Sequence, residues 1–124
     1  MHSSAWLFAN LFFTWYKGLI VPTSTSSTTI VDVGSGDYNG NLRTALEHSA
    51  LSDTSCKYIG VDLSPGPNVD VVLHDPYGDW PFEQDSVDII VSNSALEHDK
   101  FFWMTFLRMS QITKPGGLMM ISVP

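Results

Sequence analysis

The 124-residue sequence contains little cysteine, and this shortage excludes two classes of protein. Cys56 is the only cysteine, so the chain forms no intramolecular disulfide and no zinc site built from several cysteines. The four histidines share no metal-ligand spacing, and we expect no metal site. The sequence also lacks an Asn-x-Ser/Thr acceptor for N-glycosylation. These absences favour a reducing compartment, and we predict a cytoplasmic protein.

Positive charge is also scarce. Six Lys and Arg residues stand against 13 Asp and Glu residues, which gives a net charge of −7. A field of this sign repels nucleic-acid phosphates and anionic lipids, so we expect no nucleic-acid partner. Residues 1–31 contain no acid, whereas most of the acids lie in residues 62–99. A cationic ligand would suit that second region.

The sequence has no hydrophobic run long enough to cross a membrane. Its N-terminal apolar stretch, Ala5–Phe13, is far shorter than the ~20 residues of a span, and no basic segment precedes it as in a signal peptide. We interpret residues 1–22 as an apolar helix packed on the domain, with a role at an interface or in partner binding left open. A polar linker is expected at 23–28, before a single domain at 29–124.

Five short segments rich in β-branched residues predict strands that are buried on both faces. Helical spacing of apolar residues at 41–48, and a second helical segment at 99–110, alternate with them. This alternation is typical of an α/β fold with a parallel sheet covered by helices on both faces. The predicted strands are 29–33, 57–62, 69–73, 87–91 and 118–123.

Acidic and small residues follow the predicted strands where each strand ends. Asp32 closes the first strand, Asp62 the second and Asp75 the third, and Ser92–Ser94 follow the fourth. A single acid at such a turn is most simply a solvated loop residue or a helix cap. Because ligands bind beyond the carboxyl ends of parallel strands, three acids at successive strand ends predict a binding site.

Two glycines after the first strand indicate a close backbone approach to the ligand. Gly34 and Gly36 permit a tight turn, and the helix that follows presents free N–H groups. No Gly-Lys-Ser/Thr sequence occurs, which excludes a Walker-type phosphate loop. Asn39 occupies the third glycine of the dinucleotide fingerprint, so this residue and Asp32 disfavour a hydride-transferring dehydrogenase.

In these segments the chain resembles the S-adenosylmethionine-dependent methyltransferases of the Rossmann-like class, in particular the type-11 group. The resemblance runs from about Ile30 to Pro124, and its strength lies in the order and spacing of segments that are each common alone. The matching segments are Val31–Gly36, Tyr58–Ser64, Trp80–Ser92, Ala95–His98 and Lys114–Leu118.

The resemblance implies a Rossmann-like three-layer sandwich with a mostly parallel sheet of five strands in the order 3-2-1-4-5. The closing antiparallel strands of the complete seven-stranded sheet are missing, so the chain resembles a C-terminally shortened member that retains the cofactor half. The apolar strand 118–123 would then form a sheet edge, which invites self-association.

The resemblance also implies S-adenosyl-L-methionine as the cofactor. Gly34 and Gly36 would line its methionine part, with Asp32 near the ammonium group, while Asp62 would accept the ribose hydroxyls and Asp75 would face the adenine amino group. This cofactor is net cationic, in agreement with the acidic strand ends. The candidate cofactor-binding residues are Asp32, Gly34, Ser35, Gly36, Asp62, Leu63, Asp75, Pro76 and Asn93.

Two positions depart from the family pattern. Tyr38 replaces the usual third glycine of the turn, which predicts a wider loop or a later helix start. Pro76 follows Asp75 and has no N–H to offer the adenine ring, so that contact is lost or moves to Tyr77.

His98 is the candidate catalytic residue, as a base for an acceptor that must lose a proton. The alternative is that His98 only orients the loop before the aromatic helix. We expect the apolar stripe of that helix (Phe101–Trp103, Phe106 and Leu107) to be core, with Phe101 or Trp103 reaching the site.

We therefore predict a methyltransferase that acts on an unidentified small-molecule acceptor. The alternative is a catalytically inactive cofactor-binding remnant, or a partner-dependent module, of the same fold.

Overall fold

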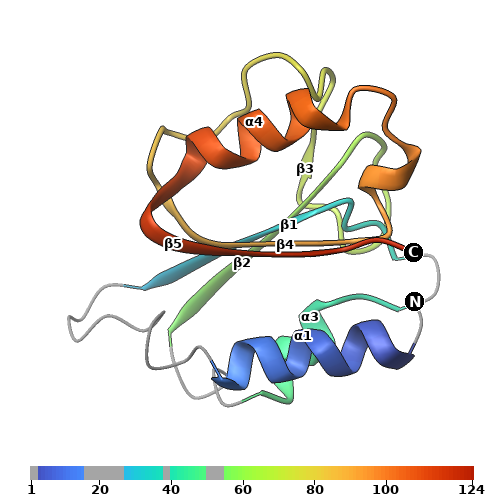
Figure 1. The fold of residues 1–124 in the computed structure, drawn as a ribbon, viewed down its shortest axis with the longest axis vertical. Helices are drawn as coiled ribbons and strands as arrows, with labels where there is room; N and C mark the ends of the chain where they lie inside the picture. The colour runs from blue at the N-terminus through green and yellow to red at the C-terminus, as the bar shows by residue number, and fades with distance from the viewer. Residues whose placement is uncertain (1–2, 16–26, 38–39, 50–54) are drawn as a thin grey trace.

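A five-stranded parallel sheet in the order β3-β2-β1-β4-β5 forms the centre of the molecule (Figure 1). The computed structural model describes residues 3–15, 27–37, 40–49 and 55–124. The predicted α/β class and strand order are confirmed, and all strand pairings in these residues are parallel. The strands are β1 Thr28–Val33, β2 Cys56–Asp62, β3 Val71–Val72, β4 Val87–Asn93 and β5 Thr113–Ser122.

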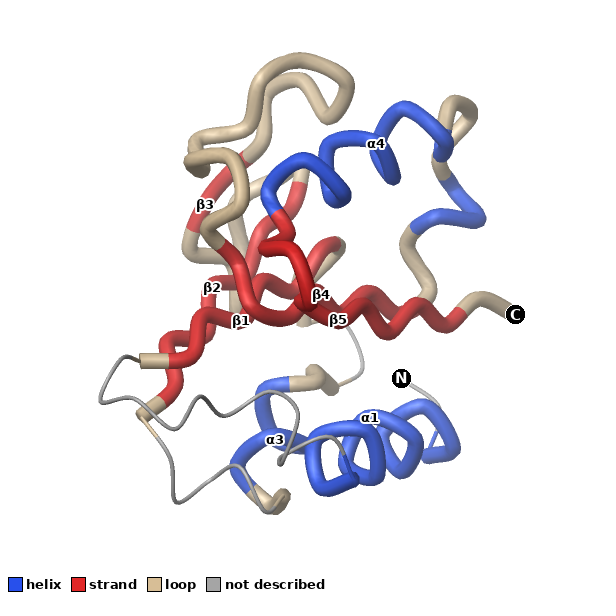
Figure 2. The backbone as a smooth tube through the Cα atoms, turned by 60° about the vertical axis from the view of Figure 1, so that its left-hand side comes forward, coloured by secondary structure: helices blue, strands red, loops and turns tan. Residues whose placement is uncertain are grey.

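Helices cover both faces of the sheet. Figures 1 and 2 show α1 (Ser3–Trp15) and α3 (Arg43–Glu47) together on one face, and α4 (Phe102–Ile112) on the other. A short 3-10 helix, η2 (Leu96–His98), connects β4 to α4. The result is the three-layer sandwich that the apolar strands predict.

The sheet separates two hydrophobic clusters because successive side chains of a strand point to opposite faces. Ile30 of β1 packs in the cluster that contains Phe13 of α1, whereas its neighbour Val31 packs in the cluster that contains Met109 of α4. Both Ile30 and Val31 have no exposed surface. Burial on both faces explains why the strands contain apolar residues at nearly every position.

The N-terminal helix α1 belongs to the same packed body as the sheet. Ala9 and Phe13 of α1 are completely buried against the sheet cluster, and the Trp6 indole N–H donates to Thr44 Oγ1 at 2.9 Å. Most of the expected linker at 23–28 lies outside the described residues, but Thr28 is already part of β1. No helix among the described residues is long and apolar enough to cross a membrane.

Three predicted elements differ most from their observed bounds. The helix expected at 99–110 begins at Phe102, because Asp99 is extended and its carboxylate accepts the Phe101 N–H at 3.0 Å. The strand expected at 69–73 is reduced to β3, after a turn in which Asn68 has a positive φ of 65°. Lys114–Gly117 lies within β5 rather than before it, as an irregularity in the pairing with β4.

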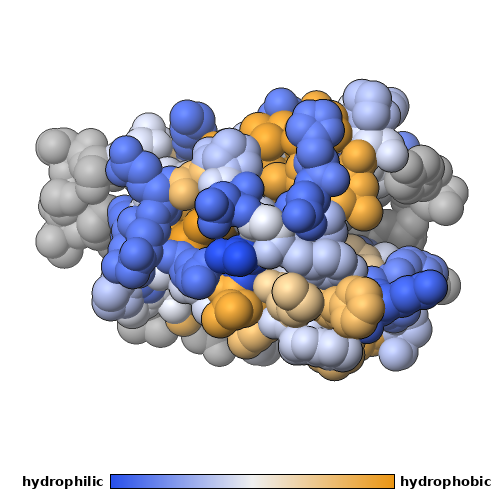
Figure 3. Space-filling view, turned by 90° about the horizontal axis from the view of Figure 1, so that it is seen from above, coloured by the Kyte–Doolittle hydropathy of each residue, from blue (hydrophilic) through white to orange (hydrophobic). Residues whose placement is uncertain are grey.

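The expectation that the apolar stripe of α4 is core was wrong. Met109 and Ile112 bury one side of this helix together with Thr105, at the spacing of a single helical face. The stripe residues are instead exposed, and Figure 3, which views the molecule from above, shows apolar patches on the surface. The exposed residues of the stripe are Phe101, Phe102, Trp103, Phe106 and Leu107.

Phe13→Ala tests whether α1 stabilises the sheet. Phe13 is completely buried, so we expect the substitution to lower the free energy of unfolding by about 3–5 kcal/mol, as for other large-to-small core changes. Phe8→Ala is the matched control, because Phe8 lies on the same helix and is 61% exposed. Urea unfolding of both variants gives the comparison. Equal, small losses would show that α1 contributes little to the core.

Candidate functional site

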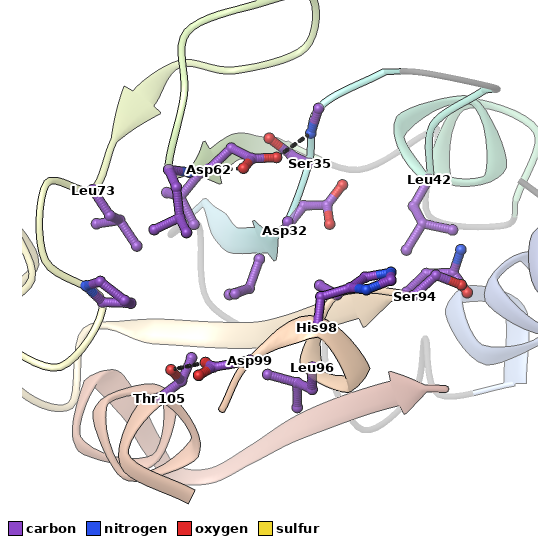
Figure 4. A pocket seen from close by; sticks show the side chains of 18 of the residues that line it. Asp32, Ser35, Leu42, Asp62, Leu73, Ser94, Leu96, His98, Asp99 and Thr105 are labelled. Atoms are coloured by element: carbon purple, nitrogen blue, oxygen red, sulfur yellow. Dashed lines mark hydrogen bonds between the residues drawn. The ribbon is translucent and has the colours of Figure 1, made fainter. Parts of the chain in front are cut away.

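The carboxyl ends of β1 to β4 open onto one cavity of about 790 Å³. In Figure 4, Asp62 and Ser35 lie on one side of this cavity, and Asp99 and Thr105 lie on the opposite side. The structure brings together all the predicted site residues except Asp75. Those that line the cavity are Asp32, Gly34, Ser35, Gly36, Asp62, Leu63, Pro76, Asn93 and His98.

The glycine loop after β1 forms one wall through its backbone. The N–H groups of Gly34 and Ser35 donate to the Val61 carbonyl at 2.9 and 3.0 Å, which ties the loop to the end of β2. Gly34 has a φ of +79°, and a Cβ there would lie 2.4 Å from the Cβ of Ala95. Only glycine fits this position, because the loops after β1 and β4 meet there.

The Asp62 carboxylate braces the same loop from β2. Its Oδ2 accepts the Gly36 N–H at 2.8 Å, and its Oδ1 accepts the Leu63 N–H at 2.7 Å. Each carboxylate oxygen has a second lone pair, so Asp62 can still accept donors from a ligand in the cavity.

Asp32 is a nearly buried acid on β1, with only 3% of its surface exposed. The Tyr58 hydroxyl on β2 donates to Asp32 Oδ2 at 2.7 Å. The Arg43 guanidinium of α3 lies 4.7 Å from the centre of the Tyr58 ring. Tyr58 and Arg43 were not predicted, because nothing in the sequence pairs residues so distant along the chain.

Burial determines the charge state of Asp32. Loss of hydration raises the pKa of the Asp32 carboxyl to about 7, although the Tyr58 hydrogen bond and the Arg43 charge oppose this shift. Burial and the neighbouring carboxyl also raise the pKa of Tyr58, so the phenol remains a donor. A cation bound beside Asp32 would favour its ionised form.

Asp75 has a role in the turn after β3. Its Oδ1 accepts the Tyr77 N–H at 2.9 Å, and a Cβ on Gly78 would lie 2.9 Å from its Oδ2. Asp75 is exposed and lies outside the cavity lining, whereas Pro76 and Tyr77 line it. The predicted contact between Asp75 and a ligand therefore has no support in this geometry.

His98 and Phe101 line the cavity from the segment between β4 and α4. The His98 side chain is 80% exposed, with Nε2 3.7 Å from Glu97 Oε1. Phe101 lines the cavity as expected, but Trp103 does not and lines a separate groove beside β5. Within the part of the chain that the structure describes, no three His, Cys, Asp or Glu side chains gather as a metal site would require.

The sequence reasoning missed several residues of the far wall. Leu73 and Trp80 are nearly buried there, and Trp80 donates its indole N–H to the Pro76 carbonyl at 3.0 Å. Asp99, just before α4, and Thr105 on α4 also line this wall. Trp80 was a usable signal, since an isolated tryptophan in a polar loop needs a packing partner.

Comparison with protein families places the sequence in a known family. Residues 16–124 match the family described as a methyltransferase domain. The chain belongs to this methyltransferase family. The predicted resemblance to S-adenosylmethionine-dependent methyltransferases is confirmed.

The methyltransferase domain matches only part of its longer relatives. It is 32% identical over 110 residues to an uncharacterized methyltransferase of Mycolicibacterium gilvum. This match covers 81% of this chain and 40% of that protein. An uncharacterized methyltransferase of Mycobacterium tuberculosis is 35% identical over 104 residues, covering 76% of this chain and 38% of the relative. The chain thus spans about two fifths of the length of these relatives.

A solved structure has the same fold. The crystal structure of the DszA carbon methyltransferase superposes with a TM-score of 0.72 at 20% identity, covering 98% of this chain and 36% of that one. The similarity extends over the sheet and the helices on both of its faces, which establishes the Rossmann-like methyltransferase fold.

The buried acid predicts how the stability of the methyltransferase domain depends on pH. The pKa of Asp32 is 3.8 in its reference state and about 7 when folded, so between these values the folded protein holds a proton that the unfolded chain has lost. The free energy of unfolding should therefore fall as pH rises from about 4 to 7, by up to about 4 kcal/mol. Asp32→Asn should remove this decline, because the amide does not titrate.

Urea unfolding between pH 4.5 and 8 measures this effect. Asp79→Asn is the control, since the Asp79 side chain is fully exposed. Hydrogen bonds lower the pKa of Asp99, so its stabilising effect is lost only below about pH 4, outside this window. Parallel pH profiles for the wild type and Asp32→Asn would contradict the assignment to Asp32.

Proposed function

We propose that this domain binds S-adenosylmethionine in the cavity at the strand ends and transfers its methyl group to a small-molecule acceptor. The observation that carries the proposal is the cavity itself, in which two carboxyls, Asp32 and Asp62, face a glycine loop in a member of the methyltransferase family. A cationic cofactor is attracted by such a pair.

The donor set fits the ribose and methionine parts of this cofactor. Asp62 retains lone pairs for two ribose hydroxyls, and the methionine chain would lie along the glycine loop, which lines the cavity at Gly34 and Gly36. Asp32 faces the same cavity and would accept the ammonium group. A structural neighbour supports this reading: the methyltransferase CalH, a complex with S-adenosylhomocysteine, has a TM-score of 0.60 and 18% identity, covering 77% of this chain and 31% of that one.

The adenine part would lie against apolar side chains. Leu63, Leu73 and Pro76 line the cavity between β2 and the turn after β3. These side chains would exclude water from the faces of a planar base. Asp75 lies outside the cavity lining and is not part of the proposed binding set. Ser35 of the glycine loop and Asn93 at the end of β4 complete the proposed binding set.

Methyl transfer requires mainly that the acceptor atom be aligned with the methyl group. The bound cofactor would supply a methyl group on a sulfonium: the acceptor would bond to the methyl carbon as the carbon–sulfur bond breaks, and S-adenosylhomocysteine would leave. The protein would hold the acceptor in line, and positioning of this kind accounts for a large part of many rate accelerations. His98 in the cavity lining is our proposed base for an acceptor that must lose a proton.

The alternative is a cofactor-binding module that has no activity by itself or that depends on a partner. It is favoured by one observation: the match covers only about two fifths of the length of the relatives. Binding of the cofactor without turnover to S-adenosylhomocysteine on an acceptor panel would support this alternative over the enzyme.

Calorimetric titration with S-adenosylmethionine tests the proposal. We expect Asp62→Ala to weaken binding by about 1–3 kcal/mol, because the ribose hydroxyls lose their acceptor. Asp79→Ala removes an exposed acid outside the cavity and should leave the affinity unchanged. No binding to the wild type at millimolar cofactor would overturn both the enzyme and the binding module.

We also propose that the domain self-associates through β5. This strand ends the sheet in the described residues, so one side of its backbone is open to another strand. An apolar groove of about 510 Å³ continues from this edge, between Ile121 and Val123 of the C-terminal segment and Phe102 and Trp103 of α4. A second copy of the chain would pair its own β5 with this edge.

Ile121→Lys should reduce self-association, because a charge on an edge strand opposes pairing. Leu107→Lys is the control, since Leu107 is an exposed apolar residue that does not line the groove. Light scattering at high concentration gives the mass of each variant. A monomeric wild type would refute the proposal.

A further inference from the structure

Two loops that line the cavity, one after β3 and one before α4, are joined by one hydrogen bond. Tyr77, in the turn after β3, donates its hydroxyl to Asp99 Oδ1 at 2.5 Å, and Asp99 belongs to the segment between η2 and α4. The Tyr77 ring also meets the Phe101 ring edge to face, with centroids 5.6 Å apart. All three residues line the cavity, so the contact closes its far wall.

Asp99 is held firmly on its own side. It accepts the Phe101 N–H at 3.0 Å and the hydroxyl of Thr105, which is buried on α4. Burial alone would raise the pKa of Asp99, but the hydrogen bonds from Thr105, Tyr77 and the Phe101 N–H lower it. Asp99 is thus a carboxylate acceptor fixed to the start of α4.

Tyr77 is fixed at its backbone as well as at its hydroxyl. Its N–H donates to Asp75 Oδ1 at 2.9 Å, and its carbonyl accepts the Arg108 Nε–H of α4 at 3.0 Å. The hydrogen bond to Asp99 raises the pKa of the phenol, which therefore remains a donor. These bonds matter because residues 73–86, between β3 and β4, contain no helix or strand that could support the wall.

The same groups are poorly suited to proton transfer. A carboxylate that accepts three hydrogen bonds and has a lowered pKa is a weak base, and a phenol with a raised pKa is a weak acid. The geometry of Tyr77 and Asp99 is instead that of a support, because α4 also holds each end of the bond, Tyr77 through Arg108 and Asp99 through Thr105.

We propose that Tyr77 and Asp99 are positioning residues that hold the far wall of the cavity in its binding-competent shape. The inference rests on the proposed function in one respect, namely that the bound molecule is S-adenosylmethionine or its product. Without the Tyr77–Asp99 bond, the turn after β3 would populate other positions, and the ligand would bind only to the fraction of molecules in which the wall is formed.

The first test is the affinity for S-adenosylhomocysteine, measured by calorimetry. Tyr77→Phe keeps the ring that packs on Phe101 and removes only the hydroxyl. We expect its dissociation constant to rise about three- to tenfold, as the loss of one hydrogen bond lowers the competent fraction. Ser110→Ala is the control, since the Ser110 hydroxyl bonds only its own helix at the Phe106 carbonyl and lies outside the cavity.

A double-variant cycle separates positioning from general destabilisation. Asp99→Ala should weaken binding, and adding Tyr77→Phe to it should weaken binding no further, because the bond is already lost. Asp99→Asn keeps an oxygen acceptor for Tyr77, and we expect it to restore most of the affinity that Asp99→Ala loses. Equal effects of Tyr77→Phe in the wild-type and Asp99→Ala backgrounds would overturn the pairing.

Hydrogen exchange of the free protein tests the support independently of any ligand. Amides in the turn after β3 should exchange faster in Tyr77→Phe than in the wild type or Ser110→Ala. If the wild type binds no S-adenosylhomocysteine, the proposed function fails and the exchange result alone decides whether the bond supports the wall. Unchanged exchange would refute the support, and unchanged affinity in a wild type that binds would refute the positioning role.

Discussion

The structure depends on the attachment of the glycine loop after β1 to the end of β2. The Val61 carbonyl accepts two N–H groups of this loop, and the Asp62 carboxylate accepts a third, from Gly36. This attachment directs the loop across the sheet until Gly34 touches Ala95 of the segment after β4. The cavity exists because hydrogen bonds to β2, and not hydrogen bonds within the loop, hold the loop in this position.

The same arrangement places an acid where water hardly reaches. Asp32 is one strand position from the loop and is covered by β2 and α3, so its carboxyl depends on Tyr58 and, at longer range, on Arg43. A neutral or half-protonated carboxyl costs little to bury, whereas an ionised one needs a partner. Under the proposed function that partner would be the cationic end of the cofactor, and burial of Asp32 would then favour a cationic ligand.

The two sides of the cavity are built differently. The side of β1 and β2 consists of strand ends and backbone hydrogen bonds, which the sheet holds in register. The far side consists of a turn without secondary structure and the start of α4, joined by side chains such as Tyr77 and Asp99. The first is a rigid framework of the fold, and the second depends on individual residues, so differences in ligand preference should arise there.

The sequence by itself determined the α/β class, the strand order through the family resemblance, and the side of the cavity formed by the glycine loop and Asp62. It did so because the apolar strands, the Asp32–Gly36 turn and Asp62 are local signals, each confined to a few consecutive residues. The start of α4 was predicted too early because the side chain of Asp99, and not the local propensity, decides where that helix begins.

Only the tertiary structure decided the rest. Tyr58 reaches Asp32, and Tyr77 reaches Asp99, across 26 and 22 residues of chain, and no pattern in the sequence relates such pairs. The same limit explains why Asp75 closes a turn outside the cavity and why the stripe of α4 is exposed. Which side of a turn or helix faces the sheet depends on how the elements pack, and packing is a property of the whole fold.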